Sequence, residues 1–128
     1  CSATGIARTA KEYLQTYTGK SVLSDLENPT AKDVFSAAGE GDTAALAILE
    51  IVFDELAMLT ATLCNTLDPQ IVLFGGGVSK AGQALTDGVA RHMGKYVFHA
   101  NAHARLGLAQ LGNDAGAYGA FKLILDNT

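Results

Sequence analysis

The pattern of hydrophobic and polar positions divides the first half of the chain into three predicted helices. Apolar and small residues recur at helical spacing over Ala3–Thr16, before a polar connection at residues 21–28. A short second helix should begin after Thr30, where an acidic residue three positions on fits a capping box, and stop at Gly39. The third helix, Thr43–Thr66, alternates apolar spacings of three and four and would be about 36 Å long. We interpret its apolar stripe as core and assign it no chemistry.

The second half alternates predicted strands and helices. Gln70–Phe74 is a short apolar run typical of a strand that is covered on both faces. A helix should follow over Lys80–His92 and end at Gly94. A second strand over Arg105–Leu111 and a last helix over 113–121, rich in small residues, complete the pattern. This order predicts an α/β fold with parallel strands.

The junction between the first strand and the next helix is the candidate binding site. Gly75, Gly76 and Gly77 remove every side chain from the carboxyl end of the strand, and Val78 and Ser79 lead into the helix. The first amides of that helix would face an anion or the edge of an aromatic ring. Neither a Walker loop nor the dinucleotide fingerprint fits the spacing. A purely structural turn, in which glycine allows positive φ and close helix packing, is the alternative.

Other polar residues have weaker claims to chemistry. His99 and His103 have the four-residue spacing of a helical metal site, but no carboxylate or cysteine lies between them, so we expect a solvated connection. Asp114 could serve as a general base, although an aspartate that opens a helix is ordinarily a cap. Three further aspartates also have structural explanations: we expect Asp33 and Asp42 to cap helices and Asp68 to belong to a turn. The residues taken alone therefore indicate a binding surface and no catalytic group.

Composition narrows the class of protein. A chain of 128 residues with 48% hydrophobic and 17% charged residues can form one domain with a core. Acidic residues interrupt the apolar tract Leu46–Leu67, so we expect no membrane span, and a net charge of −4 without a basic cluster argues against nucleic-acid binding by this segment. Cys1 and Cys64 are expected to be free thiols of a cytoplasmic protein without a signal peptide. The absence of an initiator Met suggests a piece of a longer protein.

Five blocks of the sequence occur in an order that resembles the carboxyl-terminal half of the ROK family. That family comprises bacterial sugar kinases, glucokinase-like above all, and related sugar-responsive repressors. Together the blocks span essentially the whole chain: Ser2–Arg8, Thr30–Phe35, Leu67–Pro69, Gly75–Ser79 and Leu111–Ala120.

The resemblance implies an actin-like, ribonuclease-H-like ATPase fold in which two lobes close on ATP and a sugar. Residues 1–128 would form a single nucleotide-side lobe fragment. In such kinases the glycine segment lies against the adenosine, and we carry this role onto Gly75, Gly76, Gly77, Val78 and Ser79. The family's phosphate loop, catalytic Asp, sugar-binding residues and zinc motif belong upstream of Cys1, so the chain alone should hold nucleotide without transferring phosphate.

Three functions follow as hypotheses. The first is the ATP-binding portion of a kinase that phosphorylates a hexose, with glucose expected, using ATP and Mg²⁺, with zinc in the missing upstream part. The alternative is the sugar-sensing portion of a ROK family transcriptional repressor. The third is a free-standing α/β module without a ligand. An upstream winged-helix segment would indicate the repressor, and an upstream Glu-Asn-Asp stretch would indicate the kinase.

The predicted sheet also suggests association. In the family's fold, Gln70–Phe74 would pair with Arg105–Leu111 on one side and with an upstream strand on the other. Without that strand one apolar edge is open, which predicts self-association or pairing with the missing upstream part.

Overall fold

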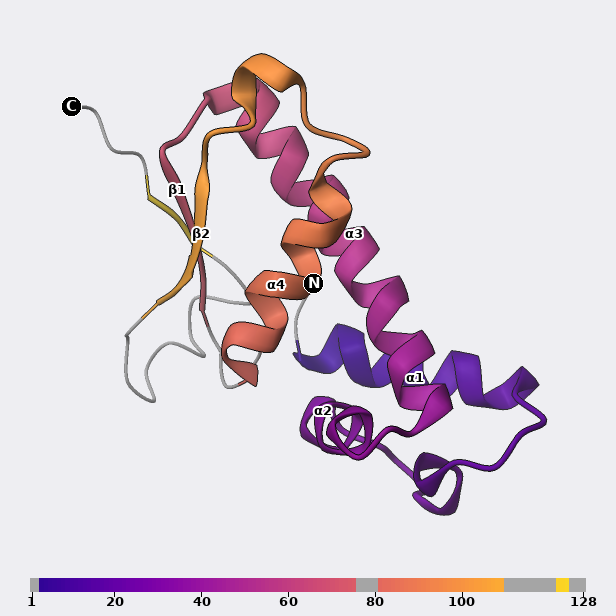
Figure 1. Ribbon diagram of the computed structural model, residues 1–128. Coiled ribbons are helices and arrows are strands. Elements are labelled where there is room, and N and C mark those ends of the chain that lie inside the picture. The colour runs from indigo at the N-terminus through magenta and orange to yellow at the C-terminus, as the bar shows by residue number, and fades with distance from the viewer. Residues whose placement is uncertain (1–2, 76–80, 110–121, 125–128) are drawn as a thin grey trace.

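The computed structural model describes residues 3–75, 81–109 and 122–124. The described elements, in chain order, are α1 (Ala3–Thr16), η1 (Val22–Asp25), α2 (Ala31–Gly39), α3 (Thr43–Leu67), β1 (Ile71–Phe74), α4 (Gln83–Met93), η3 (His99–Asn101), β2 (Arg105–Leu108) and β3 (Lys122–Ile124). Helices α3 and α4 lie beside a small sheet, and α1 and α2 pack at the far end of α3 (Figure 1). The three helices predicted in the first half are confirmed to within about one residue. The connection after α1 contains the short 3₁₀ helix η1, which was not predicted.

Two aspartates fix where the helices α2 and α3 begin. The Asp33 backbone N–H donates to Thr30 Oγ1, and the Thr30 N–H donates to Asp33 Oδ2 at 2.9 Å, which completes the predicted capping box. Asp42 caps α3 by accepting from the Ala45 N–H at 2.9 Å. Its carboxylate also accepts from the Ser21 hydroxyl and the Val22 N–H, so one side chain joins the connection after α1 to the start of α3.

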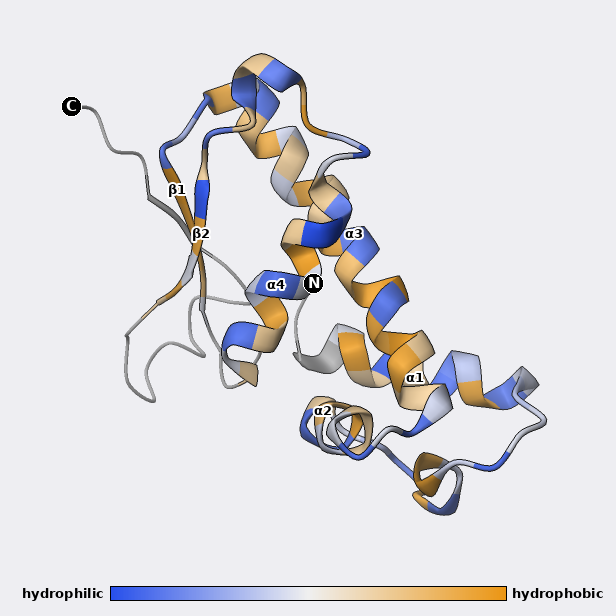
Figure 2. Cartoon of the chain, viewed as in Figure 1, coloured by the Kyte–Doolittle hydropathy of each residue, from blue (hydrophilic) through white to orange (hydrophobic). Residues whose placement is uncertain are grey.

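Helix α3 is the central element of the described part of the chain. It packs against α1, α2 and α4, and its apolar residues are distributed along its whole length (Figure 2). Ile48, Val52 and Leu56 are buried completely or almost completely, which confirms the core interpretation. The helix ends at Asp68, which has φ of +48°, and the Asp68 N–H donates to the Cys64 carbonyl.

The sheet has the strand order β2-β1-β3. Strands β1 and β2 are parallel, as predicted, and pair Ile71 with Arg105 and Phe74 with Leu108. Strand β3, which was not predicted, is antiparallel to β1, so the described sheet is mixed. In β1, Val72 and Phe74 are buried beneath the helices while the alternate residues are half-buried, so one face is covered more fully than the other.

The structure corrects the prediction of an open edge on β1. Residues Ile71–Leu73 pair with β3 on the side opposite β2. This pairing engages backbone groups that would otherwise lie unpaired on an apolar strand. The expected self-association through β1 therefore loses its structural basis.

Two element boundaries differ from the predictions. Helix α4 begins at Gln83, three residues after the predicted start, because Gly82 has φ of +69° and interrupts the helical path. Strand β2 ends at Leu108, before the predicted limit. Gly94 does end α4, but in a right-handed conformation. The predicted last helix, 113–121, lies outside the described residues.

Candidate functional site

The carboxyl ends of β1 and β2 lie side by side, because the two strands are parallel and in register. Beyond the last pair, the Ala109 N–H donates to the Phe74 carbonyl at 2.9 Å. Gly75 is buried next to this bond, and a Cβ built on it would lie 3.5 Å from the Ala109 Cβ. That distance is an ordinary contact, so the neighbouring atoms do not exclude a small side chain.

Of the five predicted site residues, Gly75 is the one that the structure describes. Gly76, Gly77, Val78 and Ser79 lie outside the described residues, so their contribution remains a prediction. The chain is described again from residue 81, just before α4.

Among the described residues, no side chain caps the amino end of α4. Gly82 occupies the cap position, and the Leu85 N–H donates to the Gly82 carbonyl at 3.1 Å. The first amides of a helix carry a partial positive charge and accept anions or polar ligand atoms. Helix α4 begins at Gln83, so its first amides lie nearer the carboxyl terminus than predicted, and their role in ligand binding remains a prediction.

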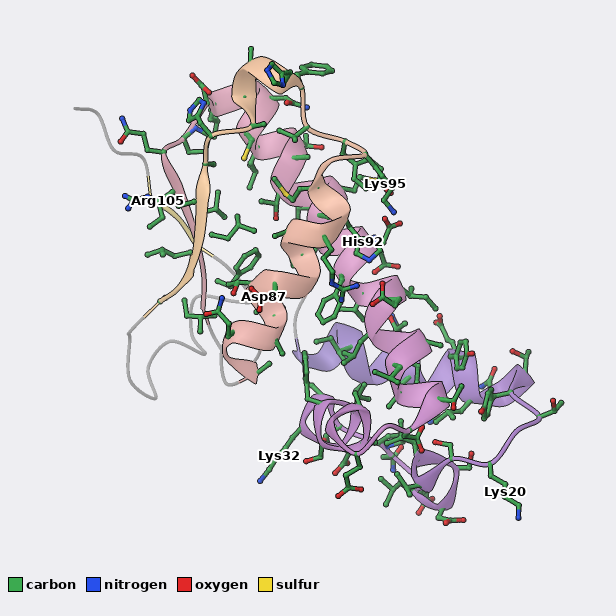
Figure 3. The ribbon with its side chains drawn as sticks, viewed as in Figure 1. Lys20, Lys32, Asp87, His92, Lys95 and Arg105 are labelled. Atoms are coloured by element: carbon green, nitrogen blue, oxygen red, sulfur yellow. The ribbon has the colours of Figure 1, made fainter. Side chains whose placement is uncertain are left out.

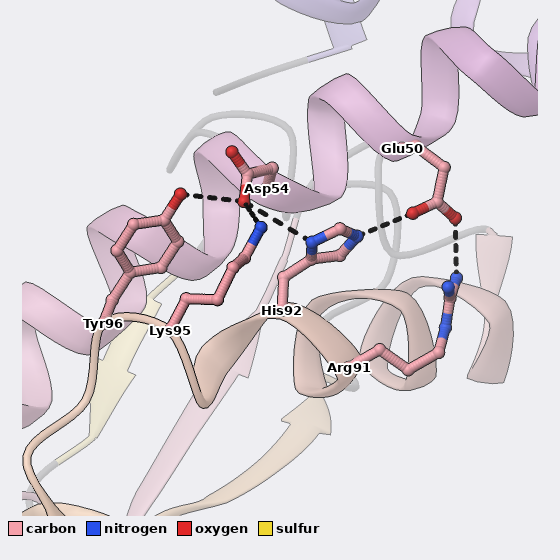
Figure 4. A network of polar contacts seen from close by, with 6 residues as sticks. All are labelled: Glu50, Asp54, Arg91, His92, Lys95 and Tyr96. Carbon is pink, nitrogen blue, oxygen red and sulfur yellow. Dashed lines mark hydrogen bonds and ion pairs between the residues drawn. The ribbon is translucent and has the colours of Figure 1, made fainter.

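A network of charged side chains holds the other end of α4 against α3 (Figure 4). His92 Nε2 lies 2.7 Å from Glu50 Oε2, and His92 Nδ1 lies 3.4 Å from Asp54 Oδ1. Arg91 forms an ion pair with Glu50 at 3.0 Å. Lys95 pairs with Asp54, and the Tyr96 hydroxyl donates to Asp54 at 2.8 Å. Sequence reasoning missed this network, because its carboxylates lie on α3 and their partners lie at the end of α4 and just after it.

The network shifts the pKa values of four of its members, which are Glu50, Asp54, Lys95 and Tyr96. The pKa of Asp54 is lowered by the hydrogen bonds from Lys95 and Tyr96. Partial burial opposes ionisation of Glu50, but hydrogen bonds from His92 and Arg91 outweigh it and lower the pKa. The same bond to Asp54 raises the pKa of Lys95 and the pKa of Tyr96. Each of these four groups therefore favours the protonation state that its partner has at neutral pH. Such mutual stabilisation is typical of a structural clamp, the name used below for this network.

A tight apolar contact lies between the two ends of α4. A Cβ built on Gly88 would lie 2.6 Å from the Phe53 Cζ, closer than real Cβ atoms approach a neighbouring atom. The Phe53 ring also packs near Phe35, and the Arg91 guanidinium lies 5.8 Å from its centre. Glycine at position 88 therefore lets α4 lie directly on Phe53 of α3. Together with the charged network, this contact holds α4 against α3.

The remaining candidates take structural roles where the structure describes them. His103 Nε2 lies 3.1 Å from Asp68 Oδ1, and the Asn101 side chain donates to the same oxygen. Within residues 3–75, 81–109 and 122–124, no three His, Cys, Asp or Glu side chains gather as a metal site. Burial raises the pKa of the Cys64 thiol, which is free, with a further contribution from the Asp68 charge. Asp114 and Cys1 lie outside the described residues.

Asp33 and Asp42 are confirmed as caps, and Asp68 ends α3. Hydrogen bonds from the backbone and hydroxyl of Thr30 lower the pKa of Asp33. Slight burial acts against ionisation of Asp42, but its bonds from Ala45, Val22 and Ser21 prevail and lower its pKa. Carboxylates engaged in this way stabilise helix starts and are poor general bases.

These features define an α/β protein with a glycine-rich segment at the carboxyl edge of two parallel strands, the edge at which open α/β sheets bind ligands. A family model described as the ROK family matches residues 1–127. The chain belongs to the ROK family, which confirms the resemblance found in the sequence.

Two of the relatives are named as glucokinases. The chain is 39% identical to a protein of Halalkalibacterium halodurans and 34% identical to one of Thermotoga maritima, over 96% of this chain in both cases. The alignments span 38% and 40% of those relatives. An N-acetyl-D-glucosamine kinase of Erwinia tasmaniensis is 32% identical over 71% of this chain and 30% of its own length. The chain thus spans about two fifths of the length of the glucokinases it matches.

Solved structures show the same fold. A putative sugar kinase from Cytophaga hutchinsonii has a TM-score of 0.72 and 25% identity, over 87% of this chain and 37% of its own. A ROK family transcriptional regulator, described as a homologue of the E. coli MLC protein, has a TM-score of 0.74 and 19% identity, over 91% of this chain and 30% of its own. None of the helices that the structure describes is long and apolar enough to span a membrane.

Proposed function

We propose that the chain is the nucleotide-side lobe of an ATP-dependent hexose kinase with an actin-like fold, and that glucose is the hexose. The observation that carries the proposal is the carboxyl edge of β1 and β2, where buried Gly75 lies beside Ala109 and a run of glycines leads toward the uncapped start of α4. Relatives named as glucokinases, at 34–39% identity, support the kinase interpretation.

In this proposal the adenosine of ATP lies against Gly75, Gly76, Gly77 and Val78, and Ser79 borders the same site. The glycines let the ring or ribose approach the backbone, and the first amides of α4 supply hydrogen-bond donors for polar atoms of the nucleotide. The charged network and the Gly88–Phe53 contact keep α4 in position at this edge.

The chemistry of transfer is assigned to the part of the relatives that this chain does not span. A hexose kinase needs a base for the sugar hydroxyl and a divalent metal, Mg²⁺ in this proposal, to offset charge on the phosphates. Three acidic residues that the structure describes have structural roles instead, because Asp33 and Asp42 are caps and Asp54 is held in the α3–α4 network. We therefore assign no metal ligand and no catalytic base to the described residues.

The alternative of a sugar-sensing portion of a transcriptional regulator is not favoured. Its support is a structure at 19% identity, a likeness that shows the fold alone. The glucokinase relatives are more similar in sequence and cover more of this chain.

Isothermal titration of the chain with ATP tests the proposal. We expect weak binding, with a Kd of about 1 mM, because only part of the site is present. Gly76→Val should weaken binding at least about fivefold by placing a branched side chain against the nucleotide. Gly94→Ala is the matched control, because this glycine lies at the other end of α4 with nothing within 4 Å of the added atom. Equal binding by wild type and Gly76→Val would count against the site.

A further inference from the structure

A groove of about 400 Å³ lies between α4, the segment that follows α4, and β2. Its apolar lining comes from Ala90 and Met93 of α4, Val97 of the following segment, and Ala104 and Leu106 at β2. No β1 residue lines it. The groove therefore follows the outer side of β2, away from the rest of the described sheet.

The backbone of β2 presents hydrogen-bonding groups at this outer side. The Arg105 N–H donates to the Gln70 carbonyl at 2.8 Å, and the Ala109 N–H donates to the Phe74 carbonyl. Because backbone groups alternate between the two edges of a strand, Arg105, Gly107 and Ala109 face β1 while Leu106 and Leu108 face outward. In the described part of the chain, no strand pairs with this edge of β2.

The groove also carries one uncompensated charge. Asp87 is the single charged residue in its lining, and it accepts a hydrogen bond from the neutral Gln83 amide at 2.9 Å. Among the described residues it has no basic partner, unlike Glu50 and Asp54 on α3. The basic residue nearest in the sheet, Arg105, extends on the side away from α4 (Figure 3).

We propose that the outer edge of β2 and this groove bind an extended peptide segment that carries a basic side chain. The peptide would add a strand to the sheet through the backbone groups of Leu106 and Leu108. Alternate side chains would enter the groove against Met93 and Val97, and a lysine or arginine would pair with Asp87. None of the residues that line the groove belongs to the predicted glycine site, so the proposal does not depend on nucleotide binding.

A second copy of the chain fits this surface less well than a basic peptide. In a symmetric dimer, two β2 strands would pair edge to edge about a twofold axis normal to the sheet. This symmetry keeps the α4-covered faces of the two sheets on the same side. The partner's basic residue of β2 would then lie on the face away from α4, and Asp87 would remain without a positive charge. Charge complementarity therefore favours a separate basic segment.

The test uses the 128-residue chain and a labelled octapeptide of alternating valine and threonine with one central lysine. Fluorescence anisotropy should show weak saturable binding, with a Kd of about 0.1–1 mM. Amide chemical shifts in the ¹⁵N-labelled chain should move for Leu106 and Leu108. A peptide that is N-methylated along one edge should not bind, because it cannot pair as a strand. A peptide with glutamate in place of lysine should bind about two- to fivefold more weakly.

Two variants test separately how backbone pairing and charge pairing contribute to peptide binding. Leu106→Pro removes the outward N–H and retains the bonds of residues 105 and 107 to β1, which is the arrangement in which an edge strand tolerates proline. It should bind the peptide at least about fivefold more weakly than Leu106→Ala, the control for loss of the side chain. Asp87→Asn should abolish the preference for lysine over glutamate. Circular dichroism verifies that each variant is folded.

The proposal is overturned if the lysine peptide does not bind at millimolar concentration or if the N-methylated peptide binds equally well. It is also overturned if the amides of Leu106 and Leu108 shift with protein concentration alone. That result would identify a second copy of the chain as the occupant of the edge.

Discussion

At the scale of single residues, the contact between Gly88 and Phe53 sets how closely α4 approaches α3. Glycine inside a helix is ordinarily unfavourable, by about 0.5–1 kcal/mol relative to alanine. Here the missing side chain leaves the space that the Phe53 ring occupies. Gly88 is therefore a packing residue, and its cost in helix propensity is offset by the contact it allows.

Gly88→Ala should lower the free energy of unfolding by about 1–2 kcal/mol, because overpacking outweighs the gain in helix propensity. Gly94→Ala, in the same helical region but with open space around the added atom, should change it by less than about 0.5 kcal/mol. Urea denaturation of both variants provides the measurement. A Gly88→Ala protein as stable as wild type would show that Phe53 can move aside without loss.

At the scale of elements, the α3–α4 pair is held by carboxylates whose ionised forms are favoured in the folded chain. Because the pKa values of Glu50 and Asp54 are lowered, this stabilisation is present at neutral pH. It is lost as the pH falls through the pKa that each carboxylate has in the folded chain. The raised pKa values of Lys95 and Tyr96 act in the opposite sense, since their contribution is lost as the pH rises through those values. The clamp should therefore weaken in both acid and strong alkali.

We expect the urea midpoint of the wild-type chain to fall as the pH is lowered from about 5 to 3, the range in which carboxylates titrate. Asp54→Asn should show a smaller fall, because it removes one of the ionised groups of the clamp. Asp87→Asn is the matched control and should retain the full dependence. Identical pH profiles for all three chains would contradict a role for Asp54 in acid sensitivity.

Most element positions could be predicted from local signals. The capping pair Thr30 and Asp33 fixed the start of α2, and the regular apolar spacing identified α3. The antiparallel strand β3 was missed because its pairing with Ile71 depends on contacts between distant parts of the chain. The start of α4 was misplaced because the positive φ of Gly82 has no distinct local signature.

The candidate site was predictable only in part. Three adjacent glycines after an apolar strand were a visible signal, and the structure locates Gly75 at the end of β1, as predicted. The network around His92 could not be derived in the same way, because Glu50 and Asp54 meet their partners only when α4 packs on α3.

At the scale of the whole molecule, the chain spans about two fifths of the glucokinases that it matches. We expect it to show no glucose phosphorylation in a coupled assay with MgATP, because Asp33 and Asp42 are engaged as caps and Asp54 is engaged in the clamp. A parallel preparation of Gly76→Val controls for host kinases, which would give equal rates in both. Turnover present in wild type and absent from Gly76→Val would contradict this expectation.

The way β1 is paired also bears on the order in which the chain can fold. Helices α1, α2 and α3 follow one another directly and contact one another, so their packing closes only short loops. The sheet instead joins Ile71 to Arg105 and to Ile124, and such distant pairing carries a larger entropic cost. During synthesis the helical portion can assemble as soon as α3 is complete. Strand β1 acquires its partner β3 only when residues 122–124 are available.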